Sequence, residues 1–410
     1  MLRRTRSIPG LTFFSARAIL LAAIGLLAGS GPATAADLSK NIHDRDSLIN
    51  SRVQFEKNKK GHVAFIGGSI TEMNGYRPMV CEILERRFPE TQFTVTDAGI
   101  SSTCSTTGAF RLEADVLSKG PVDLFFIEFA VNDDQDAAHA RRECIRGMEG
   151  ILRRARAYNP NMDIVITYFT NPGMVETIQE GGVPLSSEAH ETVARHYGIS
   201  TIDLAREVAE RITAGTLTWK TFGGTHPAPA GNAICAGMID DLMGVAWKAS
   251  LGDDAEKVAY LMPEKPLDPG HYGHGRFVDP AVAKVQRGWK LHVPAWKELP
   301  GGFRSRFSDI ALLCATEPGA ELTLQFTGNA IGAYVLAGPD AGIVEASVDD
   351  GPFVPHDLFH RFSRGLHYPR TVVFKADLTP GKHLLRLRMT DRGNEGSSGT
   401  AMRILQFTAN

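Results

Sequence analysis

A serine stands at the end of a short apolar run, in the stretch AFIGGSITEMNG at positions 64–75. Two roles fit a serine at such a point. Ser69 can cap a helix by accepting a backbone N–H, which is the commoner use of this residue type. Alternatively, Gly67 and Gly68 give the turn enough room to hold Ser69 up as a nucleophile, with its own N–H aimed at a developing oxyanion. This stretch alone favours the helix cap, so the choice between cap and nucleophile depends on the rest of the sequence.

Three other segments carry residue types that a serine nucleophile requires. Gly99 lies in DAGISSTCSTTG (97–108), Asn132 in EFAVNDDQD (128–136) and His226 in FGGTHPAPAGN (222–232). A backbone N–H at Gly99 and the Asn132 amide are possible oxyanion donors, and His226 is a possible base. Each also has a plainer interpretation: Gly99 as a tight turn, Asn132 and Asp133 as helix caps, and His226 as a solvated loop residue.

Alternating elements predict how these segments are brought together. Five apolar runs predict buried strands, and the amphipathic segments between them predict helices. The runs are at 62–66, 92–96, 123–129, 163–169 and 199–203. The spacing of Val80, Ile83, Leu84 and Phe88 predicts one helix. Longer helices are predicted near 136–158, with Ile145, Met148, Leu152 and Ala155 inside, and near 229–248. Such alternation predicts a parallel sheet whose carboxyl edge carries the functional loops.

Taken together, the four segments resemble the SGNH (GDSL-like) hydrolases. The resemblance rests on Gly67-Gly68-Ser69-Ile70-Thr71, Gly99, Asn132-Asp133 and His226-Pro227, in that order, and covers about 62 to 245. It implies an α/β esterase fold, with a parallel five-stranded sheet of the flavodoxin-like SGNH type flanked by helices. It also implies Ser69 as nucleophile, His226 as base, and an oxyanion hole made by the N–H groups of Ser69 and Gly99 and the amide of Asn132.

The chain departs from the family pattern at two positions. Gly68 stands where aspartate is usual, a change that leaves the nucleophile in place. Gly223 stands where the acid that orients the histidine is expected. We therefore expect a Ser–His dyad with a backbone carbonyl fixing the tautomer of His226, or an acid from elsewhere. Asp133, Asp134 and Asp203 are the distant candidates, and Asp203 also fits an ordinary strand-end residue.

The first 36 residues read as a secretory signal. Arg3, Arg4 and Arg6 precede the apolar run AILLAAIGLLAG and the small-residue exit GPATAA. Cleavage after Ala35 or Ala36 predicts a secreted or periplasmic protein without a stable membrane anchor. What remains has 40 basic and 46 acidic residues, a net charge of −6, which argues against nucleic-acid binding.

No cofactor or metal is predicted. The five cysteines of the chain are widely spaced and include no CxxC, so neither a disulfide scaffold nor a metal cluster is implied. The segment HYGH (271–274) reads as a loop, because two histidines without a third ligand do not make a site.

The C-terminal third has a different character. After the Pro- and Gly-rich stretch at 262–277, alternating strands recur at 321–326, 330–337, 344–351, 371–378 and 383–389. We expect an antiparallel β-sandwich, resembling the jelly-roll modules of some carbohydrate-active esterases. It either binds glycan or packs against the catalytic domain and shapes its cleft. The predicted domains are 1–36 (signal), 37–250 (catalytic), 251–300 (linker or wrapping segment) and 301–410 (sandwich).

These features predict an exported serine esterase. Its expected substrates are small acyl esters, O-acetyl groups on a carbohydrate or polysaccharide above all, since no long apolar lid segment is visible. Two alternatives remain open: a cell-wall glycan O-acetyltransferase using the same Ser69 and His226, and a noncatalytic carbohydrate-binding protein that has lost its acid.

Overall fold

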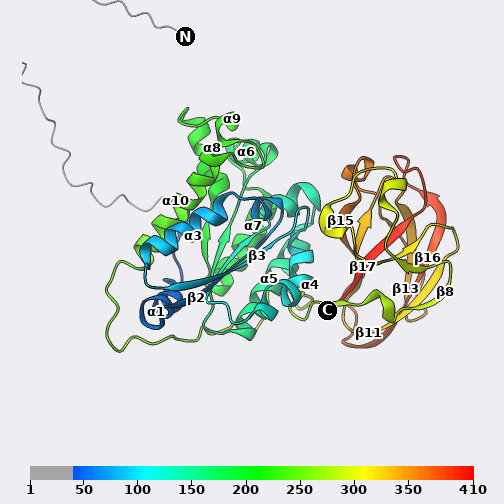
Figure 1. The fold of residues 1–410 in the computed structure, drawn as a ribbon, viewed down its shortest axis with the longest axis horizontal. Coiled ribbons are helices and arrows are strands. Elements are labelled where there is room, and N and C mark those ends of the chain that lie inside the picture. The colour runs from blue at the N-terminus through cyan, green and yellow to red at the C-terminus, as the bar shows by residue number, and fades with distance from the viewer. Residues whose placement is uncertain (1–39) are drawn as a thin grey trace, which may run out of the picture. The chain divides into compact units, whose positions relative to one another are not determined.

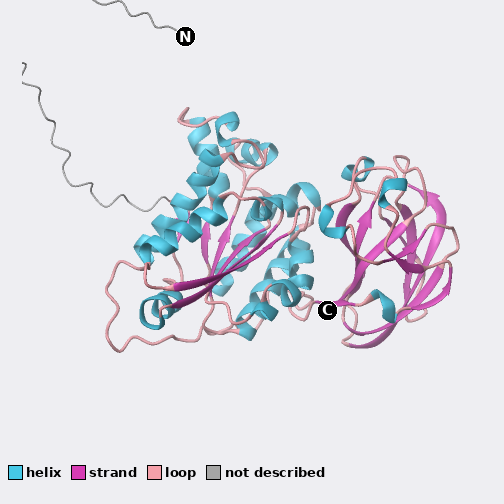
Figure 2. Cartoon of the chain, in the orientation of Figure 1, coloured by secondary structure: helices cyan, strands magenta, loops and turns pink. Residues whose placement is uncertain are grey.

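The structure is a computed structural model that describes residues 40–410. The predicted signal at 1–36 lies outside the described residues. Within 40–410, no helix is both long enough and apolar enough to cross a membrane. An α/β part comes first along the described chain and an all-β part follows (Figures 1 and 2).

The α/β part is built on one mainly parallel sheet. Five strands follow one another in parallel, and the order across the sheet is β3-β2-β4-β5-β6, the doubly wound order of flavodoxin-like folds. Their bounds are β2 Lys60–Gly67, β3 Gln92–Gly99, β4 Leu124–Glu128, β5 Asp163–Thr167 and β6 Ser200–Ile202. A sixth strand, β1 (Ile42–His43), pairs antiparallel with β6 and was not predicted. The predicted fold class is confirmed, with one strand more.

Helices cover the faces of this sheet (Figure 2). They are α1 Ile49–Asn58, α2 Ser69–Glu72, α3 Tyr76–Arg87, α4 Ser105–Asp115, α5 Arg141–Tyr158, α6 Pro172–Gln179, α7 Leu185–Tyr197, α8 Leu204–Thr213, α9 Trp219–Phe222 and α10 Pro229–Ala246. α3 packs against α10, and α5 packs against both α4 and α7. The residues predicted to face inward on α3 and α5 are buried, together with Phe88, which immediately follows α3. One apolar core fills the space between helices and sheet.

Two local predictions are wrong. The segment 92–96 was expected to be a buried strand, but β3 is the last strand of the sheet, and most of its side chains are exposed or half-buried. The helix expected from 136 begins at Arg141 instead. Asn132–Asp136 forms a short π-helical turn of its own, and the chain then bends before α5. Acidic and amide side chains in this segment bond to neighbouring segments, and sequence periodicity does not register such bonds.

The C-terminal part is an antiparallel β-sandwich, as expected. One sheet has the order β15-β12-β17-β10-β9, with β7 against β17, and the other has the order β14-β13-β16-β11-β8. The bounds are β7 Arg276–Val278, β8 Lys284–Arg287, β9 Lys290–His292, β10 Leu312–Ala315, β11 Glu321–Gly328, β12 Ile331–Ala337, β13 Gly342–Val348, β14 Val354–Asp357, β15 Tyr368–Lys375, β16 Gly381–Gly393 and β17 Met402–Ala409. β7, β8 and β9 lie in the segment 251–300, so this predicted linker supplies three strands of the sandwich.

Candidate active site

Ser69 is the first residue of α2, immediately after β2. The N-cap of this helix is Gly68, and no side chain caps it, so Ser69 does not act as the cap. The two glycines are needed for close approach. A Cβ on Gly67 would lie 2.2 Å from Thr71 Oγ1, and one on Gly68 would lie 2.1 Å from Asn132 Oδ1. The turn after β2 therefore packs tightly against its neighbours, while Ser69 itself stays half-buried and open to solvent.

His226 reaches the hydroxyl of Ser69. Its Nε2 lies 2.7 Å from Ser69 Oγ, although the two residues are 157 positions apart in the chain. The loop that carries His226 joins α9 to α10 and turns sharply through Gly223 and Gly224, whose φ angles are +103° and +92°. Asn232 holds the far side of this loop by donating from Nδ2 to the carbonyl of Pro227 at 2.7 Å. The imidazole is thus placed by its loop and remains exposed.

None of the carboxylates in residues 40–410 lies within 4.0 Å of a ring nitrogen of His226. The three candidate acids have other partners. Asp133 bonds Ser105 and His190, Asp134 accepts from Asn171, and Asp203 caps α8 by accepting from the Arg206 N–H. Asp203 is therefore the ordinary strand-end residue that its sequence context suggested.

The shape of the His226 loop explains why the family's acid is absent at Gly223. Gly223 has a positive φ, a backbone conformation that residues other than glycine rarely adopt. A Cβ there would also lie only 2.0 Å from the backbone nitrogen of Ala228. An aspartate at this position is incompatible with the loop in its present conformation.

The residues predicted for the oxyanion hole gather around Ser69. Gly67 pairs with Gly99 across β2 and β3 and with Glu128 across β2 and β4, so all three strands end at one edge. The Asn132 amide packs on Gly68, and a Cβ on Gly99 would strike the backbone of α2. As the first residue of α2, Ser69 has an N–H without an acceptor inside the helix.

Two of these donors have partners in the structure. Asn132 Nδ2 donates one hydrogen to Asp136, which leaves its second amide hydrogen. The Gly99 N–H donates to Asp97 Oδ1 at 3.0 Å. An incoming oxyanion would have to displace Asp97 as the acceptor of the Gly99 N–H. The Asn132 amide can donate its second hydrogen to the oxyanion and keep its hydrogen bond to Asp136.

The expectation that Asn132 or Asp133 caps the following helix is not met. α5 starts eight residues after Asp133, and its N-cap is Ala140. Asp133 instead accepts the N–H of Ser105, the first residue of α4, at 2.8 Å. It therefore acts on a helix that precedes it in the sequence, a contact that only the tertiary fold creates.

Glu128, which the sequence analysis did not select, lies directly behind the nucleophile turn. It is completely buried at the end of β4, and Thr71 Oγ1 donates to its Oε2 at 3.2 Å. Burial raises the pKa of Glu128 to about 8, although hydrogen bonds from Thr71 and from the Gly68 backbone oppose that rise. The carboxyl is thus largely protonated at neutral pH and supports the turn as a neutral group.

The sandwich contributes two arginines to the surroundings of Ser69. Arg306 pairs with Glu72 of α2 at 3.0 Å and donates to the Gly99 carbonyl at 3.3 Å. Arg304 donates to Ser102 Oγ at 2.7 Å. These contacts favour the expectation that the sandwich packs against the α/β part and shapes its cleft. Nothing in the local sequence around 304–306 signals this role.

The sequence analysis also missed a cluster of Cys104, Asp133 and His139, whose ligand-type atoms lie within 4.8 Å of one another. The sequence analysis found no cysteine–histidine cluster, because 35 residues separate Cys104 from His139. All five cysteines are free thiols.

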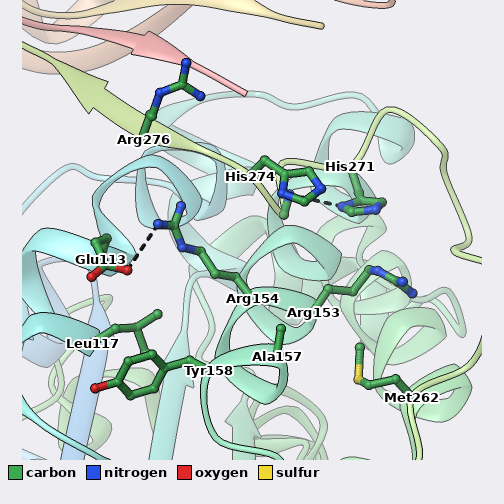
Figure 3. Close-up of a pocket in the computed structure, with 11 residues that line it drawn as sticks. Glu113, Leu117, Arg153, Arg154, Ala157, Tyr158, Met262, His271, His274 and Arg276 are labelled. Atoms are coloured by element: carbon green, nitrogen blue, oxygen red, sulfur yellow. Dashed lines mark hydrogen bonds and ion pairs between the residues drawn. The ribbon is translucent and has the colours of Figure 1, made fainter. Parts of the chain in front are cut away.

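A separate pocket of about 760 Å³ lies against α4 and α5 (Figure 3). Arg153, Arg154, His271 and His274 are among its lining residues, and Arg154 pairs with Glu113 at 3.1 Å. None of the four predicted site residues lines it. The two histidines belong to a loop, as expected for HYGH, and their ring centroids are 6.4 Å apart.

Comparison with known proteins agrees with this geometry. Residues 65–234 match the sequence model of the GDSL-like Lipase/Acylhydrolase family. The chain contains a GDSL-like acylhydrolase domain. This domain spans Ser69, Gly99, Asn132 and His226, and its chemistry is that of a carboxylic ester hydrolase. No curated protein sequence matches the chain.

Solved structures extend the agreement beyond the GDSL-like domain. A two-domain esterase active on acetylated mannans, crystallised with mannopentaose, has a TM-score of 0.70 and 21% identity, over 90% of this chain and 96% of that chain. A second crystal structure of a two-domain esterase active on acetylated mannans gives a TM-score of 0.71 at the same identity and coverage. An acetylxylan esterase from Geobacillus stearothermophilus covers 45% of this chain, with 20% identity and a TM-score of 0.35. The first two show that the α/β fold followed by a β-rich part is shared.

Proposed function

We propose that this protein hydrolyses small acyl esters on carbohydrate, O-acetyl groups above all, with Ser69 as the nucleophile and His226 as the base. The observation that carries the proposal is the 2.7 Å contact between Ser69 Oγ and His226 Nε2 at the carboxyl edge of the parallel sheet. The GDSL-like domain supplies the reaction class.

The reaction proceeds in two halves. His226 Nε2 takes the Ser69 proton while Oγ attacks the ester carbonyl, and the resulting imidazolium gives the proton to the leaving sugar oxygen as the acyl C–O bond breaks. Water, activated by the same imidazole, then releases the acyl group from Ser69. The tetrahedral oxyanion in each half accepts hydrogen bonds from the Ser69 N–H and the Asn132 amide, and from the Gly99 N–H once Asp97 yields it.

Two observations support a substrate in which a small acyl ester is attached to a polysaccharide. Ser69 is half-buried and His226 is exposed, so the reacting groups are open to an ester that projects from a polymer. The same openness admits water, which favours hydrolysis over transfer to a second sugar. The related two-domain esterase acts on acetylated mannans, and we extend that substrate class, acetylated polysaccharide, to this chain. Export through the predicted signal at 1–36 is part of the same proposal.

Acetate release from a panel of acetylated mannan, xylan and pectin tests this function. We expect the wild-type protein to release acetate from at least one of them, and the Ser69→Ala variant to release none. No acetate from any glycan, together with no turnover of 4-nitrophenyl acetate, would contradict the proposal. Acetyl transfer to an added acceptor sugar in preference to water would instead identify a transferase.

A further inference from the structure

A cysteine, a histidine and an aspartate form a chain of contacts near the candidate active site. Cys104 Sγ lies 3.9 Å from His139 Nε2, and His139 Nδ1 lies 3.6 Å from Asp133 Oδ1. Asp133 is completely buried and is itself fixed by Ser105 and His190. The order thiol, imidazole, carboxylate is the arrangement that activates cysteine nucleophiles.

The charges in this chain of contacts reinforce one another. Burial disfavours the charged form of His139, yet Cys104 and Asp133 outweigh it and raise the pKa of His139 well above its usual value. Burial disfavours the charged form of Asp133, yet the 3.6 Å ion pair with His139 and the hydrogen bond from His190 outweigh it and hold the pKa of that carboxyl far below its usual range. Asp133 is therefore a permanent anion that orients His139.

The position of Cys104 adds a further feature that favours a reactive thiol. Cys104 is the N-cap of α4, an eleven-residue helix whose first N–H groups carry partial positive charge. Thiols at helix N-termini and beside a protonated histidine are typical of reactive cysteines.

A cavity gives small molecules a route to this thiol. It has a volume of about 250 Å³, and Cys104 and His139 both line it, together with Asp136, Tyr368 and Arg370. Cys104 is only 6% exposed, which excludes large reagents and leaves room for small ones.

None of the other four cysteines lines this cavity, although Cys144 also lies beside Asp133 and His190 and contacts the backbone carbonyl of His139. Burial raises the pKa of Cys81 to about 11, and that of Cys144 and of Cys314 to about 12. Burial also raises the pKa of Cys235 well above its usual value. Cys81 is nevertheless less buried than Cys104, so accessibility alone would make Cys81 the faster of the two.

We propose that Cys104 is a second nucleophile of this protein, and that it reacts covalently with hydrogen peroxide and small alkylating electrophiles that enter the cavity. With peroxide, the proton that Cys104 has given to His139 stays on the imidazole while the thiolate sulfur attacks one peroxide oxygen. The O–O bond breaks, and the departing hydroxide takes the proton from His139 to become water. The sulfur is oxidised to a sulfenic acid, and the peroxide is the species reduced.

Modification at Cys104 also lowers ester hydrolysis, a consequence that rests on the proposed function. Asp136 lines the same cavity and accepts the hydrogen bond from Asn132, the side-chain donor of the oxyanion hole. An added oxygen or alkyl group on Cys104 crowds Asp136, and through it disturbs the position of Asn132.

Peptide mapping after timed reaction with iodoacetamide tests the thiol. The folded full-length protein is first dialysed against EDTA, so that no metal ion masks the site. We expect Cys104 to be alkylated at least about tenfold faster than Cys81. In the His139→Gln variant that rate falls about tenfold, whereas the control His196→Gln, an exposed histidine outside the cluster, leaves it unchanged. Faster alkylation of Cys81 in the wild-type protein overturns the proposal without need of a variant.

Peroxide treatment tests the consequence for catalysis. We expect a dimedone adduct on Cys104 and a severalfold lower kcat in the wild-type protein, with no loss in Cys104→Ala. Oxidation of Cys104 with unchanged kcat overturns the regulatory consequence, and an equal loss in Cys104→Ala does the same. If the untreated protein shows no esterase activity, the proposed function fails, while the alkylation rates still decide whether Cys104 is reactive.

Discussion

Replacing Glu128 by glutamine separates its ionisation from its packing. The carboxyl of Glu128 is completely buried, and its pKa rises from 4.5 to about 8 in the folded protein. Below about pH 4.5 the folded and unfolded chains are both protonated at this residue. Between that pH and about 8 the unfolded chain releases the proton while the folded chain keeps it, so stability falls as the pH rises.

The size of this loss follows from the same two values. At about 1.36 kcal/mol for each pKa unit, the interval from 4.5 to about 8 corresponds to at most about 5 kcal/mol. The Glu128→Gln variant carries a neutral amide at every pH and escapes this loss. Asp46 and Asp163, whose pKa values burial also raises, titrate equally in both proteins and cancel in the comparison.

Urea unfolding of both proteins between pH 5 and pH 9 measures the effect. We expect the free energy of unfolding of the wild type to fall relative to that of Glu128→Gln as the pH rises. The difference between the two proteins should change by a few kcal/mol from about pH 5 to about pH 9. The variant Glu264→Gln, with the same chemical change at an exposed position, is the matched control and should track the wild type. Parallel curves for the wild type and Glu128→Gln would refute a carboxyl that stays protonated behind the nucleophile turn.

Three further predictions concern the site directly. Asn132→Ala should lower kcat by about a hundredfold with little change in KM, because the donor acts on charge that develops in the transition state; a small kinetic loss would show that Asn132 is not an oxyanion donor. Gly223→Asp should lower the melting temperature and activity together, because the loop has no room for its Cβ; raised activity would mean that the loop can rearrange to accept the family's acid. His226→Ala should lower kcat on the order of ten-thousandfold, whereas changing each candidate acid to asparagine should not; a loss of that size at one of them, with the fold intact by circular dichroism, would replace the dyad with a triad.

The sequence was a good guide to the framework of the site. Continuous apolar runs located the five parallel strands and helical spacing located the main helices, because a strand covered on both faces is apolar throughout and a surface helix buries one face. The segments holding Ser69, Gly99, Asn132 and His226 then had to meet, since parallel strands present their carboxyl ends at one edge of a sheet. The distance from Ser69 to His226 agrees with that expectation.

The features that the sequence did not reveal depend on contacts between distant segments. Glu128 reads as part of an apolar strand, and only its complete burial in the folded protein raises its pKa. Arg304 and Arg306 are unremarkable in their own loop, and they matter only because the sandwich places them against α2 and the loop after β3. The exposed face of β3 was missed for a similar reason: an edge strand can carry the same residue types as a central one.

Fluorophosphonate labelling followed by peptide mapping tests the central claim most directly, because the reagent reports an activated serine without any assumption about the glycan. The account predicts a single adduct, on the peptide containing Ser69, absent from Ser69→Ala and strongly reduced in His226→Ala. An adduct at another residue of the folded protein, or an undiminished rate of labelling in His226→Ala, would contradict Ser69 as a nucleophile activated by His226.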